Sequence, residues 1–265
     1  MNDLKDTIDY TEFDYEMSVR GWTMFPNVIP KEFCNRMRDD ISGHITRCGE
    51  LQVKAGIPGA PDGTSHHTIG FGDSLDEFLE KRLLANYIER FFSGPYILHA
   101  FNPVTNSPGS KNYISRIHKD VRTYTESFGM LLNMLVMVDE FTLENGATHI
   151  ISGSHHESSQ PSETFFLKHA ERITGTQGSI VLFDSRCWHS GGANVSERSR
   201  HAFPVSFSRP FLKPQMDYAR LLGAEYGAKL SPELRQVLGY NARVPTSLDE
   251  WYQPAGSRMY HSDQG

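Results

Sequence analysis

Cysteine is scarce in this chain, and the three residues present, Cys34, Cys48 and Cys187, are scattered over 265 positions. A disulfide framework needs a denser and even set, so we interpret all three as thiols of a protein in a reducing compartment. Long apolar runs are missing as well, because no stretch of 18 apolar residues is present to form a membrane-spanning helix. The polar opening "MNDLKDTIDY" lacks the pattern of a secretory signal. These absences predict a cytoplasmic protein without a membrane span.

The chain has no excess of positive charge either, since its formal net charge is −6 at pH 7 and it contains no long basic run. A nucleic acid or an anionic membrane surface is therefore not expected as its main partner. The same charge argues mildly against a CoA thioester as substrate and for a soluble small-molecule metabolite. With 38% hydrophobic residues the chain can bury a full core, and we expect one domain over residues 1–265.

Helical patterns are concentrated in the first 95 residues. Apolar side chains four positions apart predict an amphipathic helix over 30–42, and a longer apolar stripe predicts a second helix over 74–93. Ser74 and Glu77 fit a capping box at the start of the second helix, with Ser74 as the N-cap, and Gly94-Pro95 follows the helix. Between the two helices, residues 54–70 are rich in Gly, Pro and small polar residues, which is typical of a loop that can move.

Short β-rich segments follow from about residue 96 to 210, among them "YILHAF", "YISRIHKD", "GMLLNMLVMVD", "GSIVLFD" and "HAFPVSFSR". Many short strands separated by turn residues predict an antiparallel sandwich or barrel. Residues 211–265 are expected to form a helical, wrapping tail, with a helix opened by Ser231-Pro232 and closed by Gly239. Trp251 and Tyr252 are expected to be aromatic anchors of this tail. We therefore predict a mainly β core flanked by helices at both ends of the chain.

The segment "YISRIHKDVRTY" places His118 and Asp120 two residues apart in a predicted strand, where alternate side chains point to the same face. An imidazole and a carboxylate on one face can share a metal ion, although a buried His–Asp hydrogen bond is the structural alternative. A rigid metal site needs a third ligand from another strand, and His189, after "GSIVLFDSRCW", is the candidate. Two histidines and one carboxylate are the ligand set of non-haem Fe(II) oxygenases.

Three stretches in this order resemble the phytanoyl-CoA dioxygenase-like branch of the Fe(II) and 2-oxoglutarate-dependent oxygenases. "HKD" at 118–120 resembles the family's His-x-Asp, and "MLVMVDEFTLENGATHIISGSHH" resembles its following strand, Asn-Gly turn and Gly-Ser-His segment. "HSGGANVSERSR" resembles the segment with the distal His, followed by Asn at five and Arg at eleven residues. The resemblance covers roughly residues 15–210.

This resemblance implies a double-stranded β-helix, the jelly roll or cupin-like fold. It implies that His118, Asp120 and His189 bind Fe(II), with 2-oxoglutarate and O₂ as cosubstrates. Arg200 would pair with the distal carboxylate of 2-oxoglutarate, and Asn133, in the strand "LLNMLVMVD", would touch this cosubstrate. The expected reaction is the hydroxylation of a C–H bond of a small-molecule metabolite, with release of succinate and CO₂.

Some alternatives remain open at this point. Arg198 competes with Arg200, although a guanidinium on a strand that enters the barrel suits the bidentate pairing, and the family spacing favours Arg200. Desaturation, cyclisation and epimerisation use the same metal ligands, and a non-catalytic metal- or ligand-binding barrel is the alternative from another class. Tyr124, Arg122 and Trp188 are candidates for the substrate pocket, but packing or surface roles are equally compatible with their positions.

Other histidines and cysteines are weaker candidates. His66 and His67 lie in the loop over 54–70, and His155 with Glu157 forms a His-x-Glu triplet in a Ser-rich stretch that we interpret as a solvated loop. We expect Cys187 to be a small buried thiol rather than a metal ligand.

Overall fold

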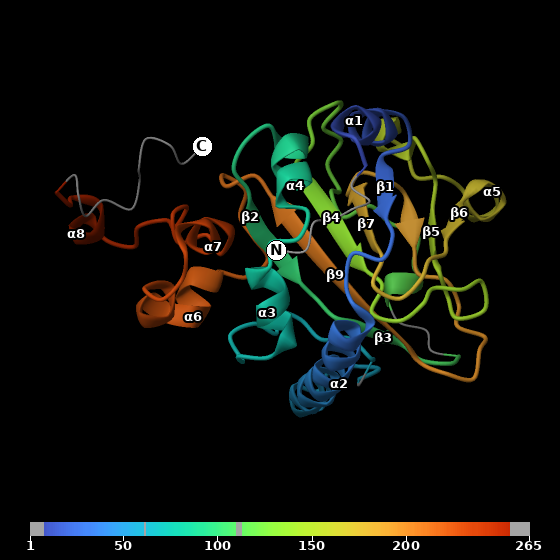
Figure 1. Cartoon of the computed structure of the whole chain (residues 1–265), viewed down its shortest axis with the longest axis horizontal. Coiled ribbons are helices and arrows are strands. Elements are labelled where there is room, and N and C mark those ends of the chain that lie inside the picture. Colours follow the sequence, from blue (N-terminus) through green and yellow to red (C-terminus); the bar gives the residue numbers. More distant parts are fainter. Residues whose placement is uncertain (1–7, 61, 110–112, 255–265) are drawn as a thin grey trace.

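The computed structural model describes residues 8–60, 62–109 and 113–254, which form two antiparallel sheets with helices around them (Figure 1). The larger sheet has the strand order β1 (Trp22–Phe25), β7 (Ile180–Asp184), β4 (Leu131–Val136), β9 (Arg200–Ser208) and β2 (Ile97–Phe101), and β3 (Val104–Asn106) also pairs with β9. The smaller sheet contains β6 (Glu171–Ile173), β5 (Thr148–Ile150) and β8 (His189–Ser190) in that order. This arrangement confirms the predicted jelly roll.

Successive side chains of the central strands point to opposite faces of the larger sheet, and each face is covered by an apolar core. On β4, Leu132, Met134 and Val136 belong to the core that includes the helices, whereas Leu135 and the following Met137 belong to a second core. The second core includes side chains of both sheets and therefore forms the interior of the barrel. Every residue of β4 is buried, because the strand lies between the two cores and both of its faces are covered.

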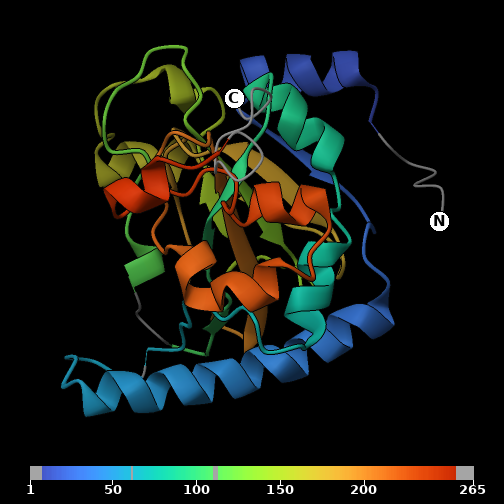
Figure 2. The same ribbon diagram turned by 90° about the vertical axis from the view of Figure 1, so that its left-hand side faces the viewer.

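The described helices are α1 (Tyr10–Val19), α2 (Lys31–Lys54), α3 (Ser74–Glu80), α4 (Ala85–Phe92), α5 (Glu163–His169), α6 (Tyr218–Gly227), α7 (Pro232–Val237) and α8 (Leu248–Trp251). Six of them contribute buried side chains to the core on the outer face of the larger sheet. The other two are α5, which lies beside β6 of the smaller sheet (Figure 1), and α8, which has no buried residue. The long α2 runs along one edge of the molecule, and α1 and α4 lie at the opposite end (Figure 2). Ser231 caps α7, and Gly239 follows it with a positive φ, as the sequence predicted.

The single helix predicted over 74–93 is two helices. Arg82 and Leu84 adopt positive φ angles of 47° and 60°, which end α3 and separate it from α4. Leu84 is buried in the helical core, so packing holds a conformation that leucine rarely adopts alone. The N-cap of α3 is Asp73, whose carboxylate accepts from the N–H groups of Leu75 and Asp76, and not the predicted Ser74.

One further expectation needs correction. The helix predicted over 30–42 continues as α2 to Lys54, twelve residues beyond the predicted end, where the buried His44 contacts the Asp73 carboxylate at 2.6 Å.

The described residues that follow α2, up to 70, form a loop, as predicted. This loop contacts the barrel, since Thr64 bridges to Val104 in β3 and the Ser65 N–H donates to the carbonyl of Pro103.

The C-terminal tail does not provide the aromatic anchors that its sequence suggested. Trp251 and Tyr252 are exposed, with 55% and 75% of their surface accessible, and residues 255–265 lie outside the described part of the chain. Within the described residues, no helix combines the length and apolarity needed to cross a membrane.

Candidate metal centre

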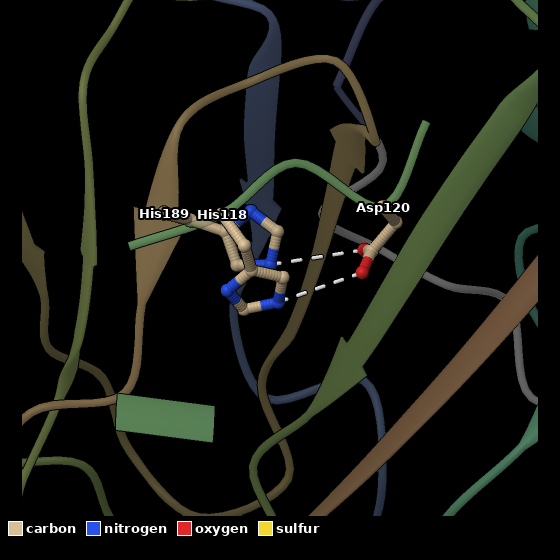
Figure 3. A group of neighbouring side chains, drawn as sticks. All are labelled: His118, Asp120 and His189. Carbon is tan, nitrogen blue, oxygen red and sulfur yellow. Dashed lines mark ion pairs between the residues drawn. The ribbon is translucent and has the colours of Figure 1, made fainter. Parts of the chain in front are cut away.

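His118, Asp120 and His189 lie side by side (Figure 3), and one possible ligand atom of each lies within 4.8 Å of those of the other two. The predicted strand over "YISRIHKD" is absent, because a 3₁₀ turn occupies Tyr113–Ser115 and His118 makes an isolated bridge to His189. In this bridge the N–H of each histidine donates to the carbonyl of the other at 3.0 Å. The backbone therefore sets the spacing of the two imidazoles, although the segment is irregular.

Both imidazoles are oriented by backbone carbonyls. Nδ1 of His118 lies 2.7 Å from the carbonyl oxygen of Arg116, and Nδ1 of His189 lies 3.0 Å from that of Cys187. A carbonyl only accepts hydrogen bonds, so each Nδ1 carries the proton and each Nε2 presents its lone pair. The two Nε2 atoms lie 3.5 and 3.7 Å from the Asp120 carboxylate. This is the tautomer that metal-binding histidines require.

The carboxylate is positioned by a chain of hydrogen bonds from the larger sheet. The Asn133 amide donates to Oδ2 of Asp120 at 2.6 Å, and the Ser206 hydroxyl donates to Oδ1 of Asn133 at 2.6 Å. The backbone N–H of Asp120 donates to the carbonyl of Ser185, just after β7. Asn133, which was expected to touch a cosubstrate, thus contacts the Asp120 carboxylate. Ser206, which pairs with Asn133 across β9 and β4, was not among the residues predicted for the site.

The charges of the three side chains are coupled. Removal from water acts to raise the pKa of Asp120, but the contact with His118 and the two neighbouring imidazoles lower it to about 2. Burial acts to lower the pKa of His118, but the adjacent carboxylate raises it above the usual value. Burial lowers the pKa of His189. At neutral pH the site thus presents an ionised carboxylate and a neutral His189, both in the form that binds metal.

The site opens to one side. His189 is buried and packs edge-on against the Phe183 ring with 5.0 Å between centroids, whereas about a third of the Asp120 side chain is exposed. A cavity of about 290 Å³ lies beside His118. Its wall includes all three substrate candidates from the sequence, Tyr124, Arg122 and Trp188. None of the described residues in 54–70 or after 240 lines this cavity.

Arg200 and Arg198 lie in different environments. Arg200 has 3% of its surface exposed, lies over the Phe141 ring at 4.0 Å and donates to the carbonyls of Asn145 and Gly146. Burial lowers the pKa of Arg200 to about 10, so the guanidinium is still charged at neutral pH. It shares a strand face with Ser206, six residues further along β9. Arg198 is exposed.

The weaker sequence candidates do not join the centre. His67 contacts the Tyr218 hydroxyl at 2.9 Å, and Cys187 is a buried free thiol as expected. His155 differs from the expectation, because it is buried with 3% of its surface exposed and its Nε2 lies 3.2 Å from the Ser18 carbonyl, while Glu157 is exposed. The Ser-rich sequence around His155 obscured this packing.

The residues present fit a divalent metal ion. Two imidazole nitrogens with fixed tautomers and one oriented carboxylate face a common point, and the open side leaves room for further ligands. A jelly roll with this ligand set defines the class of non-haem, metal-dependent oxygenases.

Comparison with known families agrees with this class. The chain belongs to the phytanoyl-CoA dioxygenase (PhyH) family, whose model matches residues 19–202, and it is therefore a dioxygenase of the metal-dependent type. The chain is 33% identical over 195 residues to the uncharacterised protein Rv1501 of Mycobacterium tuberculosis, with 71% of each chain covered. It is 27% identical over 188 residues to the dioxygenase FUM3 of Gibberella moniliformis, covering 65% of this chain and 61% of the relative.

Solved structures share the fold. AviO1 from Streptomyces viridochromogenes superposes with a TM-score of 0.57 at 17% identity, covering 79% of this chain and 99% of AviO1. EvdMO1 superposes with a TM-score of 0.56 at 17% identity, covering 74% of this chain and 49% of EvdMO1. At this identity the likeness concerns the fold.

Proposed function

We propose that this protein is an Fe(II) and 2-oxoglutarate-dependent dioxygenase that hydroxylates a C–H bond of a small-molecule metabolite and releases succinate and CO₂. The observation that carries this proposal is the convergence of His118, Asp120 and His189, with both Nε2 atoms within 3.7 Å of the Asp120 carboxylate. These residues would hold Fe(II), which supplies O₂ activation coupled to the oxidative decarboxylation of 2-oxoglutarate. The protein orients the two substrates and the ligands.

Arg200 is our candidate for binding the distal carboxylate of 2-oxoglutarate. Among the described residues its guanidinium contacts two backbone carbonyls and an aromatic ring but makes no ion pair with a carboxylate. A buried guanidinium in such surroundings favours an anionic ligand, and its planar fork suits a carboxylate. The membership of the family and the dioxygenase names of its relatives support the same assignment.

Hydroxylation is the reaction that we favour because Asp120 supplies a carboxylate ligand. The halogenating relatives have a small residue at this place, which leaves room for chloride. Desaturation, cyclisation and epimerisation use the same ligands. The product mass separates hydroxylation from these three reactions, since hydroxylation adds 16 mass units to the substrate, desaturation and oxidative cyclisation each remove two, and epimerisation changes nothing.

The test is to add Fe(II) and 2-oxoglutarate to the purified protein without O₂, record the charge-transfer absorbance, then admit O₂ and measure succinate. We expect both signals in the wild type and neither in His189→Ala. His169→Ala is the matched control, because this histidine ends the surface helix α5 and lies outside the metal centre. Metal binding without any succinate would indicate the alternative, a non-catalytic binding protein, and full turnover in His189→Ala would contradict the metal assignment.

A further inference from the structure

We propose that the substrate carries an anionic group, a carboxylate or a phosphate, which Arg116, Lys119 and Arg122 bind at the cavity beside the metal centre. This inference rests on the proposed function, because it takes the cavity next to His118 as the place where the substrate binds. It adds the chemical class of the substrate, which the family membership leaves open.

The three cations belong to one short segment that also carries two metal ligands. Arg116, Lys119 and Arg122 all line the cavity of about 290 Å³, together with His118 itself. None of the three makes an ion pair with any described residue, whereas eight of the fourteen other described arginines do. A chain with a net charge of −6 thus keeps three cations without carboxylate partners at one opening.

Arg186, the fourth cationic residue that lines the cavity, differs from the other three because it makes an ion pair. Arg186 makes a bidentate pair with Asp184, from Nε and Nη2 to the two carboxylate oxygens, and its charge is therefore compensated. Lys119 donates to the backbone carbonyl of Glu157 and lies 4.9 Å from the centroid of the Trp188 ring, and these contacts orient its ammonium group without a direct ion pair.

One further polar group of the cavity wall, the indole of Trp188, also suits an anion. Among the described residues, no aspartate or glutamate lines the cavity. The indole Nε1 of Trp188, which can only donate, is buried and has no hydrogen-bond acceptor among the described residues. A buried donor without a partner is unfavourable, so an acceptor oxygen on the ligand would satisfy it. The cavity therefore offers positive charge and donors, which match the oxygens of a carboxylate or a phosphate.

The position of the cations gives this contact a function in catalysis. Arg116 and Lys119 each lie within two residues of His118, and Arg122 is two residues from Asp120. An anionic group held by them fixes one end of a small molecule next to the metal, so that the neighbouring carbon atoms face the reactive centre. The cavity volume is at the small end of the range for ligand pockets, about 300–1,000 Å³, which favours a small metabolite.

The experiment measures the binding of four matched probes near the metal. Mn(II) replaces iron, 2-oxoglutarate is present in excess in one series and absent in a second, and the paramagnetic relaxation of probe protons is recorded. The probes are 3-phenylpropionate, 2-phenylethyl phosphate, the neutral 3-phenylpropanol and the cationic 3-phenylpropylamine. We expect the anionic probes to bind about tenfold more tightly than the neutral one, since three partly exposed cations each contribute a few-fold. The stronger of the two anions distinguishes a carboxylate from a phosphate handle.

The variant combines Arg116→Gln, Lys119→Gln and Arg122→Gln, and we expect it to lose the preference for anions. Its matched control combines Lys31→Gln, Lys54→Gln and Lys168→Gln, which changes the net charge equally at exposed helix positions. Equal relaxation of all four probes would overturn the proposal. So would a preference for anions that survives in the variant with Arg116, Lys119 and Arg122 replaced. A wild type without the Fe(II) and 2-oxoglutarate absorbance would instead contradict the proposed function, and the probe series without 2-oxoglutarate would still report on anion binding.

Discussion

Arg200 is buried and Arg198 is exposed, and this difference separates their expected contributions to cosubstrate binding. Arg200→Ala would leave the carboxylate of 2-oxoglutarate without its partner in a desolvated place, which costs about 2–5 kcal/mol, or roughly 30-fold to several thousand-fold in affinity. Arg198→Ala should cost less than about 1 kcal/mol. Both are measured by 2-oxoglutarate titration of the Fe(II) protein without O₂.

Arg200→Lys is the informative intermediate in this series. It keeps a positive charge but not the planar fork, so we expect it to recover part of the lost affinity. If Arg198→Ala is the impaired variant, the assignment of the two arginines is reversed. If neither variant changes the titration, 2-oxoglutarate is not bound in the way proposed.

Asn133 connects the carboxylate ligand to the central strand β4, and its removal should weaken the metal site without unfolding the barrel. We expect Asn133→Leu to bind Mn(II) about 10- to 100-fold more weakly, because partners of metal ligands typically contribute that much. Ser206→Ala, one hydrogen bond further from Asp120, should have a smaller effect in the same competition titration. Unchanged Mn(II) affinity in Asn133→Leu would show that the carboxylate is oriented by its backbone alone.

The raised pKa of His118 predicts how metal binding depends on pH. Below this pKa the imidazolium has no lone pair, so metal affinity should fall by up to tenfold per pH unit, and above it the affinity should level off. The decline should begin above the ordinary histidine value of about 6.5. Asp120, with its pKa lowered to about 2, should contribute nothing to this profile above about pH 4. Mn(II) titrations between pH 5.5 and 8.5 measure the slope, and a flat profile would contradict the prediction.

Among single residues, the sequence indicated the three side chains that converge in the structure, but not the residues that support them. His118, Asp120 and His189 could be proposed as metal ligands because their residue types and order resemble a family. Ser206 could not be predicted, because a serine in a strand has no distinguishing signal and its role depends on the register between β4 and β9. The burial of His155 was hidden for a similar reason, since its contacts come from residues far away in the chain.

At the scale of elements, the strands were easier to predict than the helix ends. Apolar runs such as that of β4 indicated buried strands, because both faces of the central strands are covered. The break between α3 and α4 could not be read from "KRLLA", since these residues favour helix and tertiary packing overrides that preference. The prediction of a strand around His118 is wrong, because this segment makes a single bridge to His189 and no regular ladder of hydrogen bonds.

Gly178 and Gly43 have different surroundings, so alanine at the two positions should change the stability of the protein in opposite directions. Gly178 has a φ of +88°, and a Cβ there would collide with the carbonyl of Ile29, whose N–H donates to Gly178. We expect Gly178→Ala to destabilise the protein by at least about 1–3 kcal/mol. Gly43 lies inside α2 with open space around it, so Gly43→Ala should stabilise by about 0.5–1 kcal/mol. Denaturant unfolding measures both, and equal effects of the two substitutions would contradict the prediction.

At the scale of the whole molecule, the metal centre joins the two sheets. His189 comes from β8 in the smaller sheet, whereas Asp120 is tied through Asn133 to β4 in the larger one. A metal ion bound there stabilises the folded state by about 2.7 kcal/mol at 100 times its Kd. The melting temperature should therefore rise by about 5–10 °C with Mn(II). Differential scanning calorimetry of wild type and Asp120→Ala checks this, and an equal rise in both would indicate a metal site elsewhere.

The reciprocal backbone bridge between His118 and His189 has a consequence for how such a site can change over evolution. Main-chain groups make this bridge, so the separation of the two positions does not depend on which side chains occupy them. Single substitutions at 118 or 189 can therefore introduce a different donor atom at an unchanged place, with no need for the surrounding chain to adapt at the same time. The preference for one metal over another can then vary independently of the fold that carries it.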